Sequence, residues 1–305
     1  NLSGNYYLTN DIDLNGISFT GFGSEEEPFS GIFDGKGHII SNYGYSNLSD
    51  CANFYFGIFN YNSGLIKNIG VTNYSICINA GFAGGLIGYN SGIVINSFTD
   101  GQIVSSRYSG GLVSYNSGEI KNCYTKGIIN AHEQNWYETD VYAGGIAAFN
   151  DGIIQNVYST ANINATRTSR TSGSFRAGGL VGNTSSTGII SNSFATGNVV
   201  ARGDKYALQA IAGNIVGSSQ YLNNIISCYY LETQIIEAYQ GLGFDHIVNV
   251  GTPTGLNNLY NITGLSWQAY INDINLWVHD ESVWVLNEND YPSLYWEKNI
   301  LMDFI

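Results

Sequence analysis

The sequence is poor in charge, in proline, in methionine and in long apolar runs, and two of these shortages exclude whole classes of protein. Charged residues make up 11% of the chain, with 11 Lys and Arg against 24 Asp and Glu, which gives a net charge of −13. Because nucleic-acid binding needs Lys and Arg on phosphates, we expect no nucleic-acid partner. No apolar run reaches the roughly 18 residues of a membrane-spanning helix, so we expect no membrane insertion.

Residues that favour helices are also scarce, whereas glycine, asparagine and aromatic residues are abundant. The 305 residues include 38 Gly, 37 Asn and 14% aromatics, with only 3 Pro and 1 Met. This composition favours strands and turns over long helices, and the aromatic content argues against disorder. The chain has neither an initiating Met nor a signal peptide, which favours a processed chain or a fragment.

Internal repeats occupy the middle of the chain. One copy reads GLIGYNSG at residues 85–92 and the next reads GLVSYNSG at residues 111–118. Each is followed by a segment of the form x-Ile-x-Asn-Ser/Cys-Phe/Tyr. Six copies, the last one decayed, begin at Gly57, Gly85, Gly111, Gly145, Gly179 and Gly213.

Each repeat predicts one coil of a solenoid. Gly-Leu-x-Gly-Tyr alternates as a strand does, Asn-Ser-Gly is typical of a turn, and two further short strands follow. Short parallel strands that recur in this way predict an all-β fold, a right-handed parallel β-helix with coils about 4.8 Å apart. Longer repeats carry insertions on one flank, at residues 105–108, 131–140 and 165–176.

An asparagine recurs at one phase of the repeat. Because stacked coils place equivalent residues in a column, these side chains can hydrogen-bond to the backbone and to the next coil. We interpret the column as structural rather than as a binding site. Its members are Asn68, Asn96, Asn122, Asn156 and Asn192.

The repeat resembles the GLUG motif of bacterial surface proteins, over residues 55–230. The opening segments YLTNDIDL (7–14) and FSGIFDGKGH (29–38) are similar to the start of domains that carry such repeats, and the Trp-rich ending is similar to their closing cap. The resemblance implies a β-helix, with first coils and an N-terminal cap at residues 1–54. Residues 231–305 lose the repeat and gain Trp and Leu, so we expect them to form a C-terminal cap or a separate small lobe. The resemblance also implies an extracellular, adhesin-like protein of the cell surface.

The four cysteines do not form an evident disulfide framework. Cys123 and Cys228 fall at the inward phase of repeats three coils apart, too far for a disulfide, and we expect them to be buried as small apolar residues. Cys51 and Cys77 are placed so that they could lie on adjacent coils, which leaves a disulfide between them open.

Catalytic chemistry has little support in the sequence. His38, His132, His246 and His279 are scattered without metal-ligand spacing, so we expect no metal and no cofactor. Acid, imidazole and aromatic groups gather only in the 131–140 loop, where His132 accompanies Glu133, Glu138 and Asp140. A cleft there would suit a polysaccharide lyase or glycosidase, the alternative to our first hypothesis of a non-enzymatic protein.

Aromatic residues in and beside the insertions are the candidate ligand-binding residues. If the insertions leave the same flank, their rings form a strip able to stack on sugar rings or to fill a pocket in a partner protein. The competing interpretation is that the rings cover loop backbone. The candidates are Trp136, Tyr137, Tyr142 and Tyr108, together with His132.

The chain ends in an apolar segment, which folds onto the cap or packs on the exposed end of a second copy. The second alternative would build a head-to-tail filament with an interface at Leu301, Met302, Phe304 and Ile305. Our first hypothesis is therefore a structural or adhesive β-solenoid whose partners are further copies of itself, surface glycans or other proteins.

Overall fold

Each repeat folds into two short strands joined by a sharp bend, which begins one coil of a parallel β-helix. In one copy β10 (Phe82–Gly84) precedes the bend at Gly85 and Leu86, and β11 (Ile87–Asn90) follows it. A Cβ on Gly84 would lie 1.9 Å from the carbonyl oxygen of Ile87, so the bend needs glycine. The predicted strand over Gly-Leu-x-Gly-Tyr was therefore wrong in its first half, which is a turn, and the strand before it was missed.

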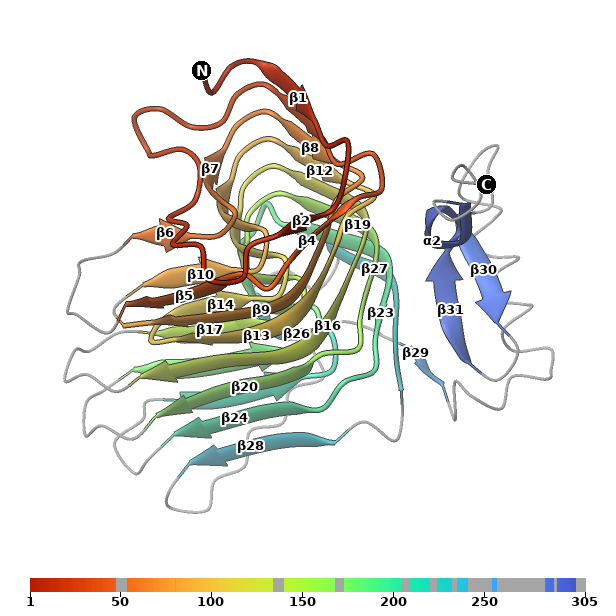
Figure 1. The fold of residues 1–305 in the computed structure, drawn as a ribbon. Coiled ribbons are helices and arrows are strands. Elements are labelled where there is room, and N and C mark those ends of the chain that lie inside the picture. The colour runs from red at the N-terminus through yellow and green to blue at the C-terminus, as the bar shows by residue number, and fades with distance from the viewer. Residues whose placement is uncertain are drawn as a thin grey trace.

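The computed structural model describes residues 1–47, 54–79, 81–133, 140–167, 173–203, 209–219, 224–231, 235–240, 254–256, 283–287 and 290–299. Strands of successive coils pair in parallel and in register, so that the coils stack into a rod (Figure 1). This confirms the all-β, parallel β-helix fold.

Two faces of the rod are six-stranded sheets, counted over the described residues. Sheet 1 consists of β6 (Tyr55–Phe56), β10, β14 (Tyr108–Gly110), β17 (Val141–Gly144), β21 (Ser174–Gly178) and β25 (Gln209–Gly213). Sheet 2 consists of β7 (Phe59–Asn62), β11, β15 (Val113–Asn116), β18 (Ala147–Asn150), β22 (Val181–Thr184) and β26 (Val216–Ser219).

Sheet 3 is larger and has two rows of strands. β16 (Glu119–Glu133) runs through both rows, and the longer first-row strands of later coils extend past the corner between the rows. The first row holds β1 (Asn5–Tyr7), β3 (Ile32–Asp34), β8 (Leu65–Lys67), β12 (Ile93–Ile95), β19 (Ile153–Ser159), β23 (Ile189–Ala195), β27 (Ile225–Leu231) and β29 (Thr254–Leu256). The second row holds β2 (Ile12–Asp13), β4 (Ile39–Ser41), β5 (Gly44–Asn47), β9 (Gly70–Ile78), β13 (Phe98–Ser105), β20 (Asn162–Arg167), β24 (Val199–Gly203) and β28 (Ile236–Gln240). Because β28 and β29 pair with β24 and β27, the coils continue beyond residue 230.

The predicted asparagine column lies at the corner between the two rows of sheet 3. All five residues adopt a left-handed backbone, with φ of 50–53°, which asparagine tolerates better than most residues. The amide nitrogen of Asn96 donates to the amide oxygen of Asn68 at 3.2 Å, and Asn122 and Asn156 continue the series. The structural interpretation of this column is therefore correct.

A second asparagine column lies inside the rod, at the end of the sheet 2 strands. Here Asn62 donates to Asn90 at 2.7 Å, Asn90 donates to Asn116 and Asn116 donates to Asn150, both at 2.8 Å. All four side chains are buried, so each amide satisfies its neighbour in place of water. This column comes from the Asn of the Tyr-Asn-Ser-Gly segment.

Aliphatic columns fill the rest of the interior. Their members align across coils at nearly zero exposure, as in the series Ile66, Val94, Ile120, Ile154 and Ile190. Cys123 and Cys228 are buried free thiols in this interior, and burial raises the pKa of both to about 12. Cys77 is also a free thiol, so the possible bridge to Cys51 is not formed; Cys51 itself lies outside the described residues.

Aromatic side chains replace aliphatic ones at the N-terminal end of the rod. Phe29 and Phe33 pack on Phe59, with ring centroids 5.1 and 5.2 Å apart. A cavity of about 330 Å³ opens beside them and is lined by Tyr6 of β1 and by Leu8, which follows that strand. His38 pairs with Asp11 at 3.1 Å, which joins the first two coils.

The C-terminal residues fold back against the side of the rod. The hairpin of β30 (Trp284–Asn287) and β31 (Asp290–Leu294) leads into α2 (Tyr295–Asn299), and we call these three elements the C-terminal clasp (Figure 1). Trp296 contacts Tyr124, Trp284 contacts Phe194, and the indole nitrogen of Trp296 donates to the carbonyl of Asn122 at 2.8 Å. No helix in the described part of the chain is long and apolar enough to cross a membrane.

Candidate functional site

The described residues on either side of the three insertions lie on one flank of the rod. Each insertion joins the end of a second-row strand of sheet 3, namely β13, β16 or β20, to the next strand of sheet 1. They are shorter than the sequence indicated, because residues 131–133, 165–167 and 174–176 belong to strands. On this flank β14 pairs with β17, which places the candidate residues Tyr108 and Tyr142 side by side.

Eight rings, six of them partly exposed, form two adjoining columns at the bend between sheets 1 and 2, which we call the aromatic seam. In sheet 1 the ring centroids of successive residues lie 4.6–4.8 Å apart, and in sheet 2 they lie 4.8–5.8 Å apart. The two columns are in contact with each other. For example, the ring centroids of Tyr55 and Tyr89 lie 5.3 Å apart. The members are Tyr55, Phe82, Tyr108 and Tyr142 from sheet 1, and Tyr61, Tyr89, Tyr115 and Phe149 from sheet 2.

Tyr108 and Tyr142 were expected to share a strip, and the structure stacks them at 4.6 Å. Tyr108 lies between Phe82 and Tyr142, and the guanidinium of Arg176 lies 5.0 Å from the centroid of the Tyr142 ring. Both rings are therefore covered by protein groups on their two faces. A sugar therefore cannot stack face to face on either ring.

A polar cluster ends the sheet 1 column of the seam. The Tyr142 hydroxyl donates to Asp140 at 2.7 Å, the backbone N–H of Ser174 donates to the same carboxylate at 2.9 Å, and Arg176 lies 3.3 Å away. Burial works to raise the pKa of Asp140, but these hydrogen bonds and the Arg176 charge together hold it below its usual value. Burial also raises the pKa of Tyr142, so the hydroxyl stays protonated.

His132 lies near the end of β16, in the second row of sheet 3. Its Nδ1 lies 2.7 Å from the hydroxyl of Thr166, and burial lowers its pKa. The partners of Asp140 are Tyr142, Ser174 and Arg176, so the structure does not bring this carboxylate to the imidazole. The side chain of Glu133 and the whole of Glu138 lie outside the described residues.

The remaining site predictions fall on residues that the structure does not describe. Trp136 and Tyr137 lie in the range 134–139, and the expected assembly residues Leu301, Met302, Phe304 and Ile305 follow the last described residue. These assignments remain predictions.

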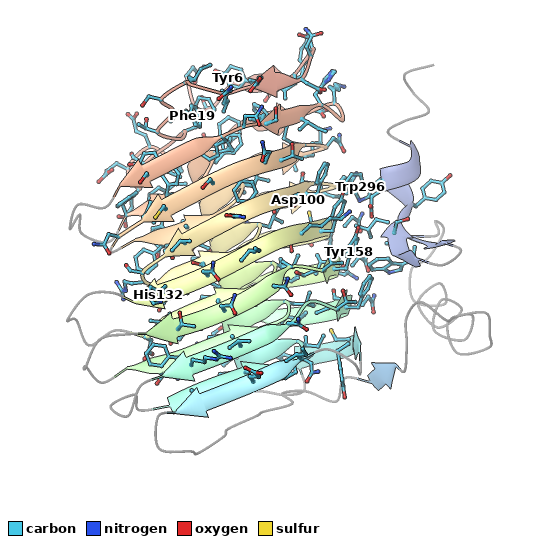
Figure 2. The ribbon with its side chains drawn as sticks, turned by 60° about the horizontal axis from the view of Figure 1, so that its bottom comes forward. Tyr6, Phe19, Asp100, His132, Tyr158 and Trp296 are labelled. Carbon is cyan, nitrogen blue, oxygen red and sulfur yellow. The ribbon has the colours of Figure 1, made fainter. Side chains whose placement is uncertain are left out.

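A second aromatic column was missed by the sequence reasoning. Phe98, Tyr124, Tyr158 and Phe194 stack at 4.8–5.0 Å with interplanar angles of 3–7°, beside the corner asparagines. The C-terminal clasp covers it, and the Tyr158 hydroxyl donates to Glu297 at 3.0 Å (Figure 2). The signal was present, because these rings follow the asparagine at one phase of the repeat.

Comparisons with known proteins agree with this architecture. Residues 173–200 match the profile of the GLUG motif, a range that includes the start of the repeat at Gly179. The fold is similar to the crystal structure of a "putative immunoglobulin A1 protease" from Bacteroides ovatus, with a TM-score of 0.61 and 24% identity over 96% of this chain and 86% of that one. No curated protein sequence matches the chain. The chain thus carries a GLUG motif, as its repeats indicated, on a parallel β-helix.

Proposed function

We propose that this chain is a non-enzymatic module of a bacterial cell surface, in which a stiff extracellular β-helix displays its flank to glycans or to other proteins. The GLUG match supports a surface protein. The observation that carries the proposal is the aromatic seam, a surface ordered over four coils by stacking and hydrogen bonding. A binding surface that is ordered before its ligand arrives loses little conformational entropy on binding.

Several acidic side chains form ion pairs or accept hydrogen bonds within the fold, which supports a structural role for them. Asp140 is paired with Arg176, Asp11 with His38, and Asp34 with Lys36 and Lys67. Asp151 accepts hydrogen bonds from Ser185 and Thr187, which lower its pKa. Each of these carboxylates joins neighbouring coils or closes a turn, and these roles leave them little freedom to move protons.

The test combines retention with product analysis. The purified chain is passed over immobilised glycans, and the same glycans are incubated with it in solution and assayed for new chain ends. We expect retention and intact glycans, and we expect Trp136→Ala to weaken retention, whereas the exposed Tyr295→Ala on α2 should not. New chain ends, or cleavage of immunoglobulin A1 in a parallel incubation, would show an enzyme instead.

A further inference from the structure

The Tyr-Asn-Ser-Gly segments contain two residues that the fold requires and two that it does not. The asparagines of coils β7, β11 and β15 form the buried amide column, and the glycines allow adjacent coils to approach. A Cβ on Gly92 would lie 2.1 Å from the carbonyl oxygen of Gly64. Asparagine and glycine are thus explained by packing, and the tyrosine and serine need another explanation.

These tyrosines and serines form a surface of their own, the Tyr–Ser face, made of Tyr61, Ser63, Tyr89, Ser91, Tyr115 and Ser117. Ser91 Oγ donates to the carbonyl of Asn62 at 3.2 Å and Ser117 Oγ donates to that of Asn90 at 3.1 Å. Each serine hydroxyl therefore points its proton at the preceding coil and keeps its oxygen available as an acceptor. Ser63 and Ser91 are exposed, and the three tyrosines are partly exposed.

Later coils keep the same backbone without this pair. The equivalent positions hold Phe149 and Asp151 in one coil, and Asn183 and Ser185 in the next. Neither hydroxyl is therefore needed to form a coil, yet three consecutive coils present both. The repetition places one Tyr–Ser pair every coil, about 4.8 Å along the rod.

A partner that meets all three pairs must offer hydroxyl groups at the coil spacing. An extended β-1,4-linked pyranose chain advances by about one sugar in that length. Its successive sugars are turned over, but both edges of every sugar carry oxygen atoms that can hydrogen-bond, so each coil still meets a polar group. We propose that the Tyr–Ser face binds a neutral, extended β-1,4-linked glycan that lies parallel to the rod, one sugar to a coil. The inference rests on the proposed function and names the ligand class for it.

The charges around the face favour a neutral chain over an acidic one. After burial, the largest influences that raise the pKa of Tyr61 are the charges of Glu25 and Glu26, and Asp151 acts in the same way on Tyr115. Negative charge therefore lies near both ends of the face, in a protein of net charge −13. A uronic-acid polymer would meet like charge there.

The first test is calorimetric titration of the whole chain with cello-oligosaccharides, from the disaccharide to the hexasaccharide. Each added sugar should raise the affinity by about two- to tenfold, as expected for one or two added hydrogen bonds, until three pairs are occupied. Longer oligosaccharides should then gain little. An affinity that is independent of chain length, or that keeps rising in equal steps, contradicts the proposal.

The second test removes hydroxyl groups and keeps the rings. The double variant Tyr89→Phe/Ser91→Ala should lower the affinity for the hexasaccharide at least tenfold. Because it also loses the hydrogen bonds of Ser91 to Asn62 and of Ser117 to Tyr89, the thermal midpoint should fall slightly while the chain stays folded at the temperature of the titration. The matched control Tyr295→Phe/Ser186→Ala removes the same groups from exposed positions elsewhere and should bind as the parent does. Equal affinity in the double variant overturns the assignment to this face.

Further probes separate this inference from the proposed function. Maltohexaose, whose α-linkages coil the chain, and anionic oligogalacturonate should both bind more weakly than cellohexaose. If cellohexaose does not bind while other immobilised glycans still retain the chain, the ligand class is wrong and the proposed function stands. If cellohexaose is shortened during the titration, the inference and the non-enzymatic function both fail.

Discussion

At the scale of single residues, two columns of asparagine hold the coils together through amide hydrogen bonds. In the corner column the amide nitrogen donates toward the N-terminal end of the rod, and in the interior column it donates toward the C-terminal end. The corner column also supplies the left-handed residue at which each coil turns. Its asparagines therefore have both a conformational and a hydrogen-bonding role.

The two roles can be separated at Asn122. Asn122→Gly keeps the left-handed backbone but loses the amide bonds to Asn96 and Asn156, which should cost about 1–3 kcal/mol of unfolding free energy. Asn122→Ala loses both features and should cost about 1–2 kcal/mol more. Urea unfolding followed by circular dichroism measures the difference, and equal losses would show that the backbone conformation is not important there.

The Asp140 cluster predicts a dependence of stability on pH. Because the folded state lowers the pKa of this carboxyl, the stabilisation is present above the ordinary Asp pKa of about 3.9 and is lost as the pH falls through the lower, folded value. Asp140→Asn should lower the thermal midpoint at neutral pH. In the variant the midpoint should also decrease less as the pH is lowered into the acid range. Asp100→Asn, on the exposed side of β13, is the matched control and should leave the profile unchanged.

At the scale of elements, the repeat predicted the parallel strands and the corner, because turn chemistry and apolar alternation recur at a fixed phase. The strand before each Gly-Gly pair was missed, because Phe-Ala-Gly and Tyr-Ser-Gly have weak strand propensity of their own. Such strands form because the neighbouring coils supply their hydrogen bonds. Tyr108 and Tyr142 occupy the same phase of the repeat, and this predicted that their rings lie side by side. The phase did not predict that Phe82 and Arg176 cover the other faces of these two rings.

The C-terminal clasp lay beyond the reach of sequence reasoning for a different reason. Its contacts join residues more than a hundred positions apart, such as Tyr158 with Glu297 and Asn122 with Trp296. No periodicity links the two partners, and the tryptophans could equally have closed the end of the rod. Only the packing of the folded chain reveals that they cover a column of aromatic side chains.

The clasp should detach without unfolding the rod. Trp296→Ala removes the ring contacts with Phe98 and Tyr124 and the bond to Asn122, so it should expose β30, β31 and α2 to hydrogen exchange and to limited proteolysis. Protection of β13, β16 and β19 should persist, because their backbone bonds and interior columns are intact. Tyr295→Ala, at an exposed ring, is the control. Simultaneous loss of protection in the coils would show instead that the clasp supports the fold.

At the scale of the whole molecule, the sequence leaves the oligomeric state open between single rods and head-to-tail filaments. Electron microscopy of the purified chain over a series of concentrations tests this. If the apolar tail builds a filament, filaments should lengthen with concentration and disappear on deletion of residues 300–305. Filaments that persist after the deletion would contradict that role, and single rods at every concentration would favour a monomeric module that displays its flank.

The direction of the backbone hydrogen bonds has a mechanical consequence. In all three sheets these bonds join one coil to the next, so tension along the rod loads the coil interfaces in series and the weakest one yields first. The clasp contacts Phe98 at one end and Phe194 at the other, three coils away. It therefore acts as a strap in parallel with three interfaces, and under a pull the coils outside the strap should separate before those beneath it.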